Sequence, residues 1–241
     1  MGFLDKLTAK WNEGKFVCVG LDNGDFEFNR KIIDQTFDLS LAYKPNAAFY
    51  KEGELQKTVS YLKSSYPDIP IILDAKRGDI GNTNEAYAKA IFDDLGVDAA
   101  TVHPYLGKES LAPFLKREDK GIFVLVKTSN PGAGEFQDLT VEGKPLYQVV
   151  AEHVKNWGSN VGIVVGATYS EELKQVRNIV GDMPILVPGI GAQGGDLEAT
   201  IKNGLNSKKQ GLIISSSRGI IFAENPREAT LNLTNQIQSL I

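Results

Sequence analysis

The sequence predicts an α/β protein that folds as a single (β/α)8 TIM barrel over residues 1–241. Apolar and mostly uninterrupted runs recur eight times, segments of helical periodicity separate them, and 241 residues suit eight strand–helix units. A doubly wound sheet is the rival fold, but it rarely needs eight equal units. The expected strands cover residues 16–21, 41–48, 69–73, 99–102, 122–126, 161–165, 185–187 and 212–214.

The N-terminal segment is expected to form a short amphipathic helix at about residues 2–13. Phe3, Leu7 and Trp11 recur every four residues, so they share one helix face that can pack on the barrel. Asp5 interrupts any apolar region of a secretory signal. We therefore read this segment as part of the folded protein.

Helix boundaries are marked at two other places. Residues 83–95 show helical periodicity, and Gly96 suits the position that follows a helix. Asn225 is a good N-cap, and Pro226 is favoured as the first residue of the last helix. No linker or low-complexity tract divides the chain, which is why one domain is expected.

Composition excludes several classes of function. The net charge of −4 gives no basic footprint for nucleic acid, and no apolar stretch is long enough to cross a bilayer. Cys18 is the only cysteine and lies in an apolar run, so a reducing cytoplasm and an unreactive core thiol are expected. Neither a nucleic acid nor a membrane is therefore expected as a partner.

Polar residues gather where the apolar runs stop. Asp22 follows the first run, Lys44 lies within the second, and Asp74 and Lys76 follow the third. Chemistry in a (β/α)8 barrel belongs at the carboxyl ends of its strands. These four charges of alternating sign are therefore expected to share one mouth of the barrel.

The stretch 73–83 carries the strongest signal. Asp74 and Lys76 are two residues apart, so a strand would place them on one face. The alternative is an ordinary surface ion pair at a strand-to-helix turn, with no functional role. The preceding run is too apolar for an edge strand, so its end is expected to open into a pocket, where each charge needs the other.

The loops after the last two strands are candidates for binding phosphate. Residues 189–195 are rich in glycine, so their backbone N–H groups can approach an anion. Arg218 follows the final strand, and its guanidinium can bind phosphate through two parallel hydrogen bonds. Two ordinary turns with a solvated arginine are the alternative, but barrels often bind phosphate between these loops.

Histidine and metal chemistry are not expected. His103 follows the fourth run, but Pro104 behind it favours a structural turn. No His, Cys, Asp and Glu cluster has the spacing of a metal site, and no Ser-His-Asp arrangement is suggested by the strand ends.

The stretch Asp74-Ala75-Lys76-Arg77-Gly78-Asp79-Ile80-Gly81-x-Thr83 resembles the signature of the orotidine 5'-phosphate decarboxylase family, in the version of one bacterial branch. The resemblance implies decarboxylation of orotidine 5'-phosphate to UMP and CO₂, the last step of de novo pyrimidine nucleotide synthesis, with no cofactor and no metal. It implies that Lys76 donates a proton, with Asp74, Lys44 and Asp79 completing a catalytic charge network.

The resemblance also implies roles in substrate binding. Asp22 and Lys44 are expected to contact the ribose, and Ser129 the pyrimidine. Pro188 is expected to form the pocket wall. The phosphate is assigned to Gln193 and Arg218.

The family is homodimeric, and the residues matching Asp79, Ile80 and Thr83 reach the partner's site. A homodimer with shared active sites is therefore expected here.

Two other functions stay open at this point. One is a magnesium-dependent phosphosugar decarboxylase or aldolase on the same scaffold, but those enzymes carry a carboxylate metal ligand after the second strand, where this chain has Lys44. The other is a barrel that binds nucleotide phosphate without turnover, although buried charges are costly if they serve no purpose.

Overall fold

The computed structural model describes residues 1–191 and 194–241 and contains a parallel eight-stranded barrel. The strand order is β2-β1-β10-β9-β8-β5-β4-β3, and every neighbouring pair in it is parallel. Bridges from Tyr43 to Ile71 and from Asn46 to Asp74 join β2 to β3 and close the ring. The predicted fold class is confirmed. The barrel strands are β1 (Val17–Leu21), β2 (Ala42–Pro45), β3 (Ile72–Arg77), β4 (Ala99–Val102), β5 (Gly121–Lys127), β8 (Val161–Val165), β9 (Ile185–Pro188) and β10 (Leu212–Ser216).

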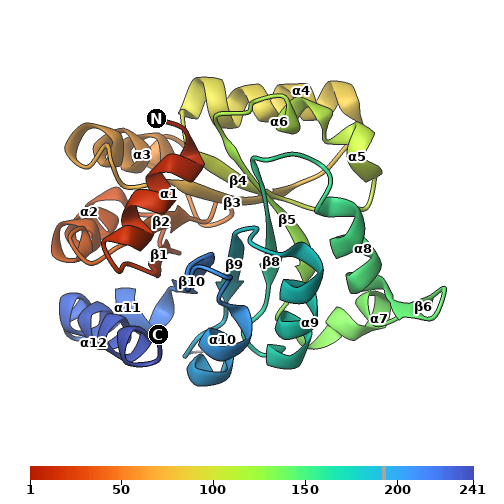
Figure 1. Ribbon diagram of the computed structural model, residues 1–241. Coiled ribbons are helices and arrows are strands. Elements are labelled where there is room, and N and C mark those ends of the chain that lie inside the picture. Colours follow the sequence, from red (N-terminus) through yellow and green to blue (C-terminus); the bar gives the residue numbers. More distant parts are fainter. Residues whose placement is uncertain (192–193) are drawn as a thin grey trace.

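Helices surround the strands, and a small antiparallel hairpin projects from one side (Figure 1). No helix in the described part of the chain is long and apolar enough to cross a membrane. The helices are α1 (Phe3–Asn12), α2 (Phe26–Thr36), α3 (Glu54–Ser65), α4 (Gly81–Ala88), the π-helix η1 (Lys89–Leu95), α5 (Gly107–Ser110), α6 (Ala112–Leu115), the 3-10 helix η2 (Pro131–Ala133), α7 (Gly134–Gln137), α8 (Leu146–Val154), α9 (Ser170–Val180), α10 (Leu197–Gly204), α11 (Arg218–Ile221) and α12 (Pro226–Ser239). The hairpin consists of β6 (Thr140–Val141) and β7 (Lys144–Pro145).

The predicted helix over 83–95 is two elements in the structure. It begins earlier, at Gly81, and continues from α4 into the π-helix η1. Gly96 ends it with φ of 76°, the left-handed conformation that favours glycine. At the last helix, the Asn225 side chain accepts the Glu228 N–H at 3.1 Å, as expected of an N-cap.

Two strands differ most from their predicted bounds. The second stops at Pro45, because the Asn46 side chain accepts the Ala48 N–H and turns the chain. The third starts at Ile72 and continues through the charged residues to Arg77, so its carboxyl end lies further along than the apolar run suggests.

Helix α1 contacts the amino ends of several strands. The Trp11 indole N–H donates to the Leu212 carbonyl at 2.8 Å, where β10 begins. Phe3 packs edge-on against Phe123 of β5, with ring centroids 5.7 Å apart. Lys6 pairs with Asp98, just before β4, at 2.9 Å. These contacts lie at the end of the barrel opposite the carboxyl ends of the strands.

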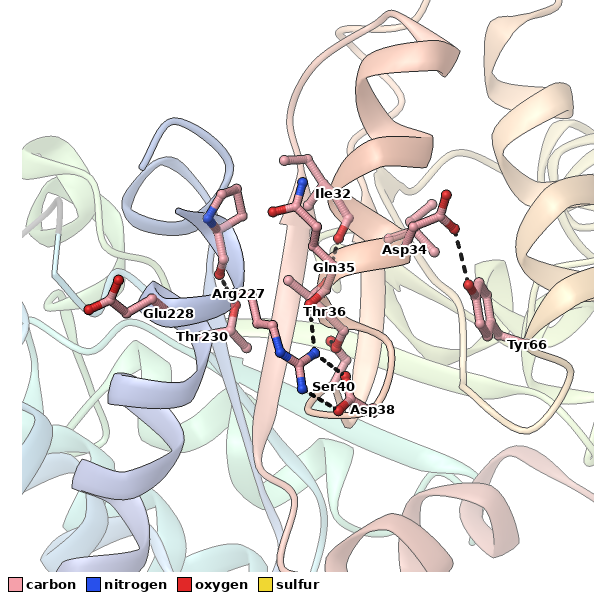
Figure 2. Close-up of polar contacts among 12 residues, drawn as sticks. Ile32, Asp34, Gln35, Thr36, Asp38, Ser40, Tyr66, Arg227, Glu228 and Thr230 are labelled. Atoms are coloured by element: carbon pink, nitrogen blue, oxygen red, sulfur yellow. Dashed lines mark hydrogen bonds and ion pairs between the residues drawn. The ribbon is translucent and has the colours of Figure 1, made fainter. Parts of the chain in front are cut away.

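The last helix docks on the first helix after β1. Arg227 of α12 forms two hydrogen bonds of 2.7 Å to the Asp38 carboxylate and one of 3.1 Å to the Gln35 carbonyl (Figure 2). Beside this pair, the buried Thr36 hydroxyl bonds the Ile32 carbonyl at 2.8 Å. The chain therefore ends beside its beginning, as a closed barrel requires.

Candidate active site

A cavity of about 230 Å³ opens at the carboxyl ends of the strands. Loops after strands that are far apart in sequence meet there, because all eight strands run in the same direction around the ring. Seven of the predicted site residues line this cavity: Asp22, Lys44, Asp74, Lys76, Ser129, Pro188 and Arg218.

Asp74 lies between two lysines. Lys44 Nζ donates to its Oδ2 at 2.8 Å, and Lys76 Nζ donates to its Oδ1 at 2.5 Å. The Lys44 side chain is only 7% exposed, whereas that of Lys76 is 51% exposed and reaches into the open cavity. The sequence prediction that Asp74 and Lys76 form a pair in a pocket is confirmed.

The two lysines decide the ionisation of Asp74. Burial would raise the pKa of this carboxyl, but the positive charges of Lys44 and Lys76 outweigh it and hold the pKa well below its usual range. Burial would likewise lower the pKa of Lys44, but Asp74 and Asp22 outweigh burial and raise it. The buried ion pair is therefore charged on both sides at neutral pH.

The two carboxylate oxygens of Asp22 differ in their partners. Its Oδ2 accepts the Ser217 hydroxyl at 2.6 Å, whereas its Oδ1 is buried and has no partner within residues 1–191 and 194–241. A buried acceptor of this kind needs a donor. Because Asp22 lines the cavity, a hydroxyl of a bound ligand could supply it.

The loops after β9 and β10 form one side of the cavity. Gly189 and Gly191 have φ of 105° and 79°, so this loop uses conformations that favour glycine. Arg218 is exposed at the beginning of α11 and lines the cavity. Gln193, the other predicted phosphate ligand, lies outside the described residues.

A hydrogen-bonded clamp holds the loop that carries Ser129. The Thr128 N–H donates to Gln137 Oε1 at 2.9 Å, and Gln137 Nε2 donates to the Thr128 hydroxyl at 2.8 Å. The Thr128 hydroxyl in turn donates to Asn130 Oδ1 at 2.7 Å. Ser129 is thereby fixed between two anchored neighbours.

The chain matches known decarboxylases over nearly its whole length. The family described as "Orotidine 5'-phosphate decarboxylase / HUMPS family" matches residues 15–233. A protein of Cupriavidus metallidurans named orotidine 5'-phosphate decarboxylase is 45% identical, over 98% of this chain and 94% of its own. One of the same name from Thermomicrobium roseum is 46% identical, over 100% and 96%. The chain belongs to the orotidine 5'-phosphate decarboxylase family. The family predicted from the sequence is thus confirmed.

Solved structures agree with this family assignment. The OMP decarboxylase of Leishmania donovani superposes with a TM-score of 0.93 at 38% identity, covering 100% of this chain and 99% of its own. The UMP synthase of the same organism gives a TM-score of 0.95 at 40% identity, and this chain spans 56% of its length. The decarboxylase family fold therefore extends over the whole chain.

Three predicted site residues of the family signature are placed differently. Asp79, Ile80 and Thr83 are not among the described residues that line the cavity of their own barrel. The buried Asn84 holds this segment: its Oδ1 accepts the Asp79 N–H at 3.1 Å, and its Nδ2 donates to the carbonyls of Asp79 and Ser110 at 2.7 and 2.6 Å. The Ile80 side chain is left 61% exposed.

His103 has a packing role. Its ring lies directly against Gly78, where an added Cβ would come within 2.6 Å of ring atoms. Any larger residue at position 78 would collide with the imidazole, which accounts for the glycine. Within the described ranges, no group of three or more His, Cys, Asp and Glu residues could hold a metal ion.

Sequence reasoning missed other polar residues of the cavity. Asn46, Thr101, Ser215 and Ser217 also line it. Thr101 gave one available signal, as the single hydroxyl residue in the apolar run 99–102. Gln137, which anchors the cavity residue Thr128, gave no such signal in the sequence, because their contact spans a loop whose path the sequence does not determine.

Proposed function

We propose that this chain catalyses the decarboxylation of orotidine 5'-phosphate to UMP and CO₂, the last step of de novo pyrimidine nucleotide synthesis, without a metal or an organic cofactor. The observation that carries the proposal is the Asp74 carboxylate bonded to both Lys44 and Lys76 in the cavity. The names of the bacterial relatives support the same reaction.

The array suits a reaction that leaves a carbanion. The bond between C6 of the pyrimidine and its carboxylate breaks, CO₂ departs, and the electron pair stays on C6. The Lys76 ammonium can stabilise that charge and then donate its proton to C6. Solvent reprotonates Lys76, which is half exposed. Asp74 lies beside the departing carboxylate in this proposal and holds Lys76 in position.

The remaining cavity residues hold the nucleotide. Asp22 and Lys44 bind the ribose hydroxyls, which gives the unpartnered Oδ1 of Asp22 its donor. Ser129 binds the pyrimidine, and Pro188 forms the pocket wall. Gln193 and Arg218 bind the phosphate. Because the phosphate does not react, the energy of binding it can serve to organise the reacting end.

The proposal includes a homodimer in which each site is completed by the partner chain. Asp79, Ile80 and Thr83 would reach the partner's cavity, with Asp79 completing the charged array. Support comes from the exposure of Ile80 and from the Asn84 clamp, which holds the segment outside its own cavity. Each chain would act as one domain over residues 1–241, in the cytoplasm, where a buried free thiol such as Cys18 stays reduced.

An assay of orotidine 5'-phosphate in the presence of a chelator tests the proposal. The purified protein should consume orotidine 5'-phosphate, measured as the loss of the substrate's absorbance, and should release UMP. The rate should be the same with and without EDTA. Turnover that needs added magnesium would favour the phosphosugar-type alternative. Binding of the nucleotide with no turnover at all would instead favour a binding module.

A further inference from the structure

The third strand contains an irregularity at its functional end. In the ladder between β3 and β4, Leu73 pairs with Ala100 and Arg77 pairs with Val102, so three residues of β3 face the single residue Thr101. Lys76, the last of these three, has φ of 46°, which is rare for a residue with a side chain. The backbone N–H groups in this bulge have lost their regular partners in the strand, and something else must satisfy them.

The Thr101 hydroxyl takes over these contacts. It accepts the N–H of Ala75 at 3.1 Å and the N–H of Lys76 at 3.0 Å, and it donates to Asp74 Oδ1 at 3.0 Å. A hydroxyl offers one donor and two acceptor positions, so all three are in use. Because both lone pairs receive N–H groups, the hydroxyl proton can point only to Asp74.

We propose that Thr101 is a positioning residue for the decarboxylation, acting through Asp74 and Lys76. Thr101 is only 2% exposed. Its hydroxyl connects the backbone N–H of Lys76, the proton donor, to the Asp74 carboxylate, which orients the Lys76 side chain. Valine has the same shape but would leave two N–H groups and one carboxylate oxygen without this partner. The proposal rests on the proposed function, since Lys76 has this role only if the reaction is the one described.

The test compares three substitutions that separate the hydroxyl from the shape of the side chain. T101V and T101A both remove the hydroxyl, and T101A, with its smaller side chain, provides a second test if T101V fails to fold. T101S keeps the hydroxyl. T36V is the matched control, because Thr36 is equally buried and hydrogen-bonded but lies on α2 (Figure 2) and does not line the cavity.

In T101V and T101A, kcat on orotidine 5'-phosphate should fall on the order of 10²-fold, the size expected when reacting groups are displaced by about an ångström. The Kd for UMP should stay within about threefold, because the phosphate and ribose contacts remain. T101S should keep most of the wild-type kcat. T36V should lower the urea midpoint without lowering kcat.

Wild-type kcat in T101V or T101A would overturn the proposal, as would an equal loss in T101S. An inactive wild-type protein would instead reject the proposed function. Crystal structures of the T101V and T101A variants test the positioning claim independently of turnover. The Lys76 backbone or the Asp74–Lys76 ion pair should shift, and an unchanged bulge and ion pair would contradict the proposal.

Discussion

Asp74 shows how a costly arrangement can be stable. A buried carboxylate is expensive unless cations and hydrogen-bond donors surround it. Here Lys44, Lys76 and the Thr101 hydroxyl all donate to its two oxygens. The positive charge of Lys76, which reaches into the open cavity, suits an anionic substrate and a developing carbanion.

Replacing Lys76 with alanine should abolish turnover and spare binding. The proton donor is lost, so kcat should fall by about 10²–10⁴-fold or more. The Kd for UMP, measured by calorimetry, should change little, because Arg218 and Asp22 remain. A K76A variant with near-normal kcat would show that another group supplies the proton.

Removing Lys44 should change the pH dependence. In the wild type, two lysines hold the pKa of Asp74 well below its usual range, so Asp74 stays ionised as the pH falls. K44M removes one of them while burial continues to raise the pKa, so Asp74 should take up its proton at a higher pH. The acid limb of kcat/KM should therefore move to higher pH than in the wild type. Normalised profiles that superimpose would refute the coupling.

The role of Arg218 can be tested by comparing a ligand that carries a phosphate with one that does not. R218A should weaken UMP binding by on the order of 2–5 kcal/mol, the usual loss for a charged hydrogen-bonded pair, and leave uridine binding almost unchanged. R227A is the control, because Arg227 pairs with Asp38 on the outside of the barrel. Equal losses for UMP and uridine in R218A would place the phosphate elsewhere.

At the scale of elements, strand ends were the most predictable part of the site. Parallel strands bring their carboxyl ends together whatever the loops do, so Asp22, Lys44 and Asp74 could be assigned to one cavity from their places in or directly after apolar runs. Lys76 also pairs with Asp74, but through a bulge with a left-handed residue rather than through regular alternation. The bulge depends on Thr101, from another strand, and local patterns do not reveal such a contact.

The hairpin of β6 and β7 was not predicted. Its two turn residues, Glu142 and Gly143, have φ of 51° and 82°. Such turns usually contain Asn-Gly or Asp-Gly, and glutamate gives no comparable signal in the sequence. The strands are also only two residues long, too short for an alternating pattern.

Helix α1 should contribute to stability and not to catalysis. W11A removes a buried indole and its hydrogen bond to Leu212 at the amino end of the barrel, so the free energy of unfolding in urea should fall by about 3–5 kcal/mol. T8A changes the exposed face of the same helix and should cost less than about 0.5 kcal/mol. A fall in kcat of folded W11A would contradict the claim that the amino end of the barrel contributes to stability and only the carboxyl end to catalysis.

At the scale of the whole molecule, apolar side chains remain uncovered near the proposed dimer contact. In the loops after β3 and β4, Ile80 is 61% exposed, Tyr105 is 90% exposed and Leu106 is 44% exposed. Exposed apolar side chains that gather in one region are typical of an interaction site. A second copy of the chain would cover these residues and bring its Asp79 to the cavity.

Mixing two inactive variants tests the shared active site most directly. K76A and D79A should each be nearly inactive alone. In a mixed dimer, one site would carry both substitutions and the other neither. Co-expression should therefore restore roughly a quarter of the wild-type activity if the chains assort at random. If Asp79 acts in its own barrel, every site keeps one substitution. A mixture that stays inactive, although mass spectrometry detects mixed dimers, would contradict the account.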